Sequence, residues 1–100
     1  MPLELVALGH EREPDRLTVR GVIRNPAGGS DVGPLTAVVM LFNHDGGFIA
    51  SGRVAVDGPS LGPGGERTFV VSVPAGGEIG RYRVSFRSDD RVVPHVDRRS

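Results

Sequence analysis

The sequence predicts an all-β fold, a single immunoglobulin-like or fibronectin-like β-sandwich of about seven strands. Several short segments alternate apolar and polar residues with the period of two that is typical of a half-buried strand. Gly, Pro, Asn and Asp gather between these segments, as they do in turns. No segment combines the spacing of an amphipathic helix with capping residues at its ends.

The chain of 100 residues is long enough for one domain, and we expect residues 1–100 to form it. Apolar residues make up 38% of the chain and Trp is absent, so Val, Leu, Ile, Ala and Phe must supply the core. Two sheets can each bury one face against the other, which explains why most predicted strands carry a single apolar face.

The first half of the chain contains four predicted strands, and the last two of them form a hairpin. The four strands cover residues 3–8, 16–24, 35–42 and 48–56. In the second strand the inward positions are Leu17, Val19, Gly21 and Ile23. In the fourth they are Phe48, Ala50, Gly52, Val54 and Val56. Gly52 is expected to mark a bulge or a crossing between sheets.

The second half follows the same pattern and predicts three further strands, which cover residues 66–73, 81–87 and 91–96. The inward positions of the first two are Phe69, Val71, Val73, Tyr82, Val84 and Phe86. Leu61 is expected to plug the preceding loop, and Tyr82 to form a structural corner whose hydroxyl ties back to its own loop. Pro94 lacks a backbone donor, which places the last strand at a sheet edge.

The strand predicted at residues 35–42 is apolar on both faces. The core would bury the face of Leu35, Ala37, Val39 and Leu41. The opposite face, which normally meets water, carries Val38, Met40 and Phe42. Either neighbouring Arg side chains cover it, with Arg83 stacked on Phe42, or it contacts another copy or domain. The candidate interaction face therefore comprises Val38, Met40, Phe42, Arg81 and Arg83.

The polar residues do not form a recognisable catalytic or metal-binding motif. Asn43, His44 and Asp45 offer ligands to Ca²⁺, but such a site needs about 6–8 oxygens. We therefore interpret this cluster as a hairpin turn with an Asx-type hydrogen bond. His10 and His95 are too far from His44 in sequence to predict a zinc site. There is no nucleophile elbow and no phosphate-binding loop, so we expect neither an enzyme nor a cofactor.

Charge and hydropathy argue against two further classes of function. The 12 basic and 12 acidic residues balance, which leaves no general electrostatic attraction to nucleic acid. No apolar run reaches the roughly 18 residues of a membrane-spanning helix, so we expect no direct membrane insertion. The absence of Cys excludes a disulfide framework.

Three stretches of the chain carry a resemblance to a known family. They are residues 17–25, residues 39–46, and the Leu61-Gly62-Pro63-Gly64 element that leads to Phe69. Together they resemble the bacterial FxLYD-type domains, from about Leu17 to Phe86. The chain departs from the family pattern where Asn43-His44 replaces the hallmark Tyr-Asp before the turn. The resemblance implies an immunoglobulin-like accessory domain of an envelope or multi-domain protein, and it transfers no catalytic residue.

We therefore expect a non-enzymatic accessory or protein-interaction domain of a bacterial protein, which acts through a sheet face or an edge strand. Its partner would be a second copy or a neighbouring domain of the same parent protein. The resemblance implies a place in the cell envelope only where the parent protein carries a signal or anchor, so the sequence leaves the compartment open. The alternative is a loop-based module that binds carbohydrate or calcium. A sugar site usually presents exposed aromatic rings, however, and this chain has one Tyr and no Trp.

Overall fold

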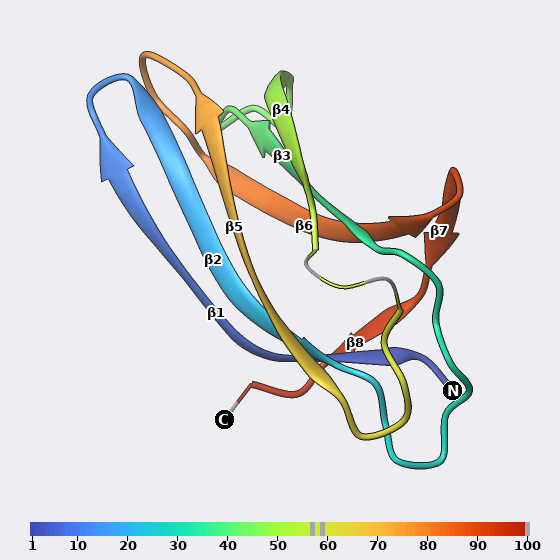
Figure 1. The fold of residues 1–100 in the computed structure, drawn as a ribbon. Coiled ribbons are helices and arrows are strands. Elements are labelled where there is room, and N and C mark those ends of the chain that lie inside the picture. Colours follow the sequence, from blue (N-terminus) through green and yellow to red (C-terminus); the bar gives the residue numbers. More distant parts are fainter. Residues whose placement is uncertain (57, 59, 100) are drawn as a thin grey trace.

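The predicted β-sandwich is confirmed by a computed structural model, which describes residues 1–56, 58 and 60–99. The described residues form β1 (Leu3–Glu13), β2 (Arg16–Arg24), β3 (Thr36–Phe42), β4 (Phe48–Ala55), β5 (Glu66–Pro74), β6 (Arg81–Ser88), β7 (Arg91–Val93) and β8 (His95–Asp97). One sheet has the order β5-β2-β1-β8 and the other the order β4-β3-β6-β7 (Figure 1). These orders follow immunoglobulin-like topology: the hairpins β1–β2, β3–β4 and β6–β7 each stay within one sheet, and the chain changes sheet between β2 and β3, between β4 and β5, and between β5 and β6.

The two sheets bury their facing sides against each other. The buried apolar residues include Leu17, Val19, Ile23, Val39, Leu41, Phe69, Val71, Val73 and Phe86, most of which the alternation predicts as inward. At the centre the rings of Phe69 and Phe86 pack edge to face, with centroids 5.4 Å apart. Leu61 is 2% exposed, which confirms that it plugs its loop.

Gly21 makes room for this aromatic centre. A Cβ atom at Gly21 would lie 2.6 Å from the Cζ atom of Phe69 and 2.8 Å from the carbonyl oxygen of Ala7. Contacts this short do not occur between real atoms, so any larger residue would displace the ring or the neighbouring strand. The absent side chain therefore allows Phe69 to lie over β2.

Gly52 has a different role from the one predicted, because it marks neither a bulge nor a crossing. It lies where β4 of one sheet meets β5 of the other. A Cβ atom at this position would lie 3.1 Å from Cγ2 of Val73 and 3.3 Å from the carbonyl oxygen of Ser72. We call this contact between β4 and β5 the closed seam.

The bulge in this hairpin lies three residues before Gly52, and it overturns the prediction for Phe48. Leu41 pairs with Ala50, whereas Phe42 pairs with Phe48, so Ile49 is the extra residue. Because one extra residue reverses the phase of a strand, Phe48 points outward and is 61% exposed rather than buried.

The last predicted strand is two strands in different sheets. β7 pairs antiparallel with the end of β6, and β8 pairs parallel with the start of β1. Pro94 lies between them, where the chain changes sheet, and its carbonyl oxygen accepts a hydrogen bond from the Leu3 amide at 3.0 Å. The prediction of one strand across residues 91–96 is therefore wrong, although both short strands do lie at sheet edges.

Two loops at the lower end of the sandwich in Figure 1 are held together by Asn25, a buried polar residue that is 1% exposed. Its Nδ2 atom donates to the carbonyl oxygens of Ser30 and Leu61, both at 2.8 Å. Its backbone amide donates to Gly65 and its carbonyl accepts from Gly64. These bonds satisfy the buried amide and close this end of the core.

Candidate functional site

The inward face of β1 changes character along the strand. The strand continues to Glu13, well past the Leu8 boundary that the sequence predicts. Its pairing with β2 shifts between Leu5 and Ala7, where a bulge lies. Beyond this bulge the residues opposite the inward side chains of β2 are Leu8, His10 and Arg12. The side of β1 that faces the other sheet is thus leucine in its first half and exposed polar residues in its second half.

His10 meets Tyr82 across the space between the two sheets. The Nδ1 atom of His10 lies 3.3 Å from the Tyr82 hydroxyl, and the two rings pack edge to face with centroids 5.3 Å apart. Burial raises the pKa of Tyr82, and the positive charge of Arg99 partly offsets this shift. The Tyr82 hydroxyl therefore contacts the opposite sheet, and the predicted tie to its own loop is wrong.

Arg12 fastens the β5–β6 loop to the β1–β2 turn. Its guanidinium donates to the carbonyl oxygens of Arg16 at 2.8 Å, Ala75 at 3.2 Å and Gly77 at 2.6 Å, and also to that of Glu13. Arg presents several donors in a rigid fork, which suits it to holding several carbonyl groups at once. This side chain is consequently occupied by structural bonds.

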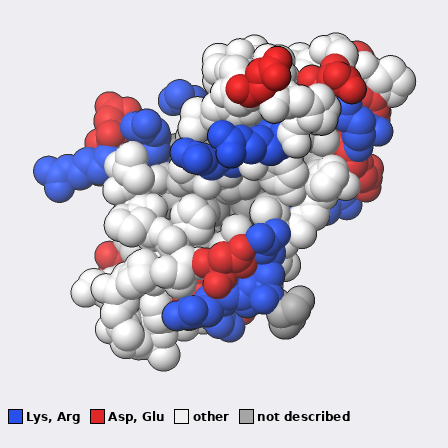
Figure 2. Space-filling view, turned by 180° about the vertical axis from the view of Figure 1, so that it is seen from behind, with Lys and Arg blue, Asp and Glu red and all other residues white. Residues whose placement is uncertain are grey.

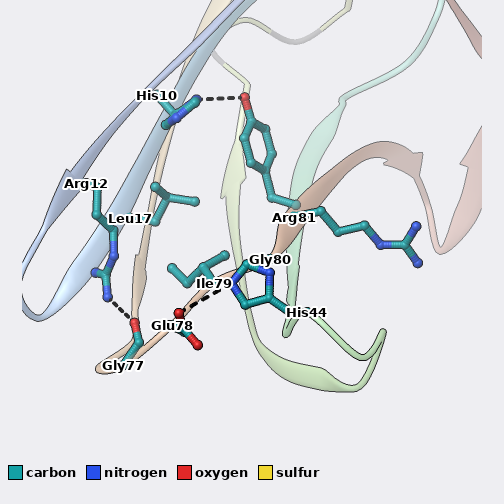
Figure 3. A pocket seen from close by; sticks show the side chains of 10 residues that line it. His10, Arg12, Leu17, His44, Gly77, Glu78, Ile79, Gly80 and Arg81 are labelled. Carbon is teal, nitrogen blue, oxygen red and sulfur yellow. Dashed lines mark hydrogen bonds and ion pairs between the residues drawn. The ribbon is translucent and has the colours of Figure 1, made fainter.

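A cleft of about 600 Å³ lies among these groups (Figure 3). It is lined by His10, Arg12, Leu17, His44, Gly77, Glu78, Ile79, Gly80, Arg81 and Tyr82. We call the space between β1 and β6, into which this cleft opens, the open seam. His44 and Glu78 form an ion pair at 3.6 Å on the rim of the cleft.

His10, Arg12 and His44 each contact a neighbouring residue of the cleft, and they do not converge on one point where a ligand would be held. Figure 3 shows His10 bonded to Tyr82, Arg12 to Gly77 and His44 to Glu78. In the part of the chain that the structure describes, no three His, Asp or Glu side chains form a group that could hold a metal ion. The cleft therefore offers shape and apolar walls more than free charged groups.

The hairpin turn at residues 43–47 has the Asx-type hydrogen bonds that the sequence predicts. The Oδ1 atom of Asn43 accepts from the amides of Asp45 at 3.0 Å and Gly47 at 2.8 Å. Gly46 adopts a positive φ of 86°, as tight turns of this kind require. The Asn43 oxygen that could have served as a calcium ligand is thus already bonded within the turn.

The predicted interaction face divides into a covered half and an open half. Val38 is 6% exposed, and its cross-strand neighbours are Arg53 on β4 and Ser85 on β6. Met40 and Phe42 are half-buried. Phe48, which the sequence places inside, packs edge to face against Phe42 at 6.2 Å and extends the open half.

Arg81, and not Arg83, stacks on this aromatic pair. The guanidinium carbon of Arg81 lies 5.2 Å from the ring centroid of Phe42, within the range of a cation–π contact. Arg83 pairs with Met40 along the sheet and remains exposed. We call Met40, Phe42, Phe48 and Arg81 the aromatic patch.

From the sequence, His10 and Arg12 were not predicted to line a cleft, and Phe48 was not predicted to be exposed. The signal for the first two was present, since the apolar positions of β1 change phase after Leu5. Recognising Phe48 required the bulge, which carries no glycine to mark it. The described part of the chain contains no helix that is long and apolar enough to cross a membrane. Comparisons with protein-family models, with curated proteins and with solved structures find no match.

Proposed function

We propose that this chain is a non-enzymatic protein-interaction domain that docks a partner on the aromatic patch. The observation that carries the proposal is that Phe48 is 61% exposed. It packs against Phe42, on whose ring Arg81 stacks. Aromatic side chains, Met and Arg are the residues enriched at the centres of protein–protein interfaces. The partner is a second copy of the chain or a neighbouring domain of the same bacterial parent protein.

The geometry of the patch suits a docking surface. Phe42 and Phe48 are cross-strand neighbours on the outward face of a hairpin, and the sheet beneath them is buried on its other side. Such rings are held by the sheet and lose little conformational freedom on binding. Arg81 adds a positive charge that would sit beside an acidic group of the partner.

Sedimentation velocity of the wild type and of Phe48→Glu tests self-association through this patch. We expect wild-type dimers at high protein concentration and monomers for Phe48→Glu, because a carboxylate would be buried in the interface without a partner. Met40→Glu should act in the same direction.

The matched control is Val70→Glu. Val70 is an apolar residue, 55% exposed, on β5 of the other sheet, and its substitution should leave the dimer intact. A wild type that remains monomeric at every concentration would contradict self-association. Equal loss of dimer in Val70→Glu would show that general surface charge, rather than the patch, governs association.

A loop-based ligand-binding function remains the second candidate, and the cleft is the observation that favours it. Its lining contains a single aromatic residue, Tyr82, for a sugar ring to stack upon. For calcium, the turn oxygens of Asn43 are already bonded. A rise of the melting temperature with added calcium or sugar would favour this candidate over the patch.

A further inference from the structure

We propose that the open seam is an acceptor site for one extended polypeptide strand, which would pair with the edge of β6 and place alternate side chains in the cleft. The partner has a defined chemistry: apolar residues that alternate with Asp or Glu. The site adjoins the aromatic patch and shares Arg81 with it, but it takes a strand on the edge of β6 rather than a partner on the sheet face, so it goes beyond the function proposed above.

The first observation is that β6 is paired along only part of its outer edge, the edge that faces away from β3. β3 pairs with it from Arg81 to Arg87 on the inner side. On the outer side β7 pairs only with Phe86, Arg87 and Ser88, because the chain then crosses to the other sheet at Pro94. Among the residues that the structure describes, no strand lies beside the outer edge from Arg81 to Ser85.

The second observation is the direction of the backbone groups on this edge. Ser88 and Arg91 close the two-residue hairpin between β6 and β7. In an antiparallel ladder every second residue turns its N–H and C=O groups to the same side. Counting back from Ser88, Val84 and Tyr82 turn theirs toward the side that β7 leaves empty. An added strand can therefore pair with both residues.

The third observation is that the cleft lies directly below this edge. Tyr82 belongs to β6 and to the cleft lining, together with Leu17 and Ile79 as apolar walls. A strand added beside β6 would turn every second side chain inward, next to Tyr82 and Val84. Apolar side chains on that face would fill the cleft and extend the core.

The charges beside the edge specify the other face of the partner. Arg81 and Arg83 point outward on β6, and both are exposed. Neither forms an ion pair with any residue in the described part of the chain. Figure 2 shows basic side chains gathered beside a hollow on the rear face of the molecule. Acidic residues on the added strand would be their cross-strand neighbours.

Other edges of the sandwich are less suited to pairing. β4 and β5 meet at the closed seam. The free part of β1 begins at a bulge, which protects a sheet edge from pairing by twisting it. The outer edge of β6 from Arg81 to Ser85 contains no proline, and its pairing with β3 is regular.

The experiment measures binding of a fluorescent peptide, acetylated and amidated, with the sequence Val-Glu-Val-Glu-Val-Glu-Val, by fluorescence anisotropy. We expect the wild type to bind it and Arg83→Glu to bind it at least about fivefold more weakly, because attraction becomes repulsion at the edge. The same peptide with Lys in place of Glu should show the opposite preference. Arg53→Glu, on the outward face of β4, is the matched control and should bind like the wild type.

A second peptide, N-methylated at alternate residues, tests the backbone pairing directly. It should lose binding, and hydrogen exchange at the amides of Tyr82 and Val84 should slow only with the unmodified peptide. Equal binding of both peptides, or absence of binding by the wild type, would overturn the proposal. Phe48→Ala, which removes the exposed ring of the aromatic patch without adding a charge near Arg81, should leave peptide binding unchanged, so failure here is distinguishable from failure of the aromatic patch.

Discussion

The two seams of the sandwich are built from the same kind of strand and differ in what lies between the sheets. At the closed seam β4 and β5 approach so closely that a Cβ atom at Gly52 would lie 3.1 Å from Cγ2 of Val73, so a side chain there would push its neighbours aside. At the open seam β1 and β6 are bridged by one His–Tyr contact and leave a cleft of about 600 Å³. The comparison indicates that the side-chain volume at single positions controls how closely the edges of the two sheets approach on each side of a small sandwich.

The open seam is itself sealed at one end. There the ring of His95, on β8, packs edge to face against Phe86 of β6 at 5.2 Å. Toward the other end β8 has already ended, and β1 presents His10 and Arg12 in place of leucine. The cleft therefore lies along the part of β1 beyond its parallel pairing with β8.

The largest expected effect comes from forcing the closed seam apart. Gly52→Val should lower the free energy of unfolding by about 1–3 kcal/mol, since the added methyl groups would press on Val73 and the Ser72 carbonyl. Urea denaturation measures this loss. Gly9→Val is the matched control, because a Cβ atom at Gly9 meets nothing within 4 Å. If Gly9→Val were equally destabilising, the cost would come from the strand backbone and not from the seam.

The next effect concerns the sealed end of the open seam and depends on pH. Burial against Phe86 lowers the pKa of His95 below its usual 6.5, and the charge of Asp97 partly offsets this. As the pH falls below about 6.5, the unfolded chain therefore binds a proton at His95 before the folded chain does, and stability decreases. Melting curves between pH 7.5 and 5 should show a steeper fall for the wild type than for His95→Gln. Identical slopes would mean that His95 does not hold this end of the seam.

The smallest effect is expected at the bridge across the open seam. Tyr82→Phe removes the hydroxyl that contacts His10 and should cost about 0.5–1 kcal/mol, because the bond is partly open to water. Urea denaturation again provides the measurement. A loss as large as that of Gly52→Val would show that this contact, rather than the packing below it, holds the two sheets together.

Much of the fold was predictable because alternation is a local property. The inward positions of β2, β5 and β6 can be read from residues two apart, and Leu17, Phe69 and Phe86 are buried as expected. The turn at Asn43 was predictable for the same reason, since its hydrogen bonds join residues close in sequence.

The candidate sites depended on features that alternation cannot express. A bulge of one residue turned Phe48 outward, and a second bulge in β1 turned His10 toward the opposite sheet, where it remains exposed. The cleft requires knowing that β1 faces β6, which is a matter of sheet order. The division at Pro94 also lay beyond sequence reasoning, because a proline at an edge and a proline between sheets have the same local pattern.

The parallel pairing of β8 with β1 also has a mechanical consequence. Leu3 and Leu5 pair with His95 and Asp97, and the two strands run in the same direction. Tension that pulls residue 3 away from residue 97 along these strands loads their hydrogen bonds in shear, so that they must break together. The ion pair between Glu4 and Arg98 spans the same junction. The domain is thus fastened against stretching at the place where its first and last strands meet.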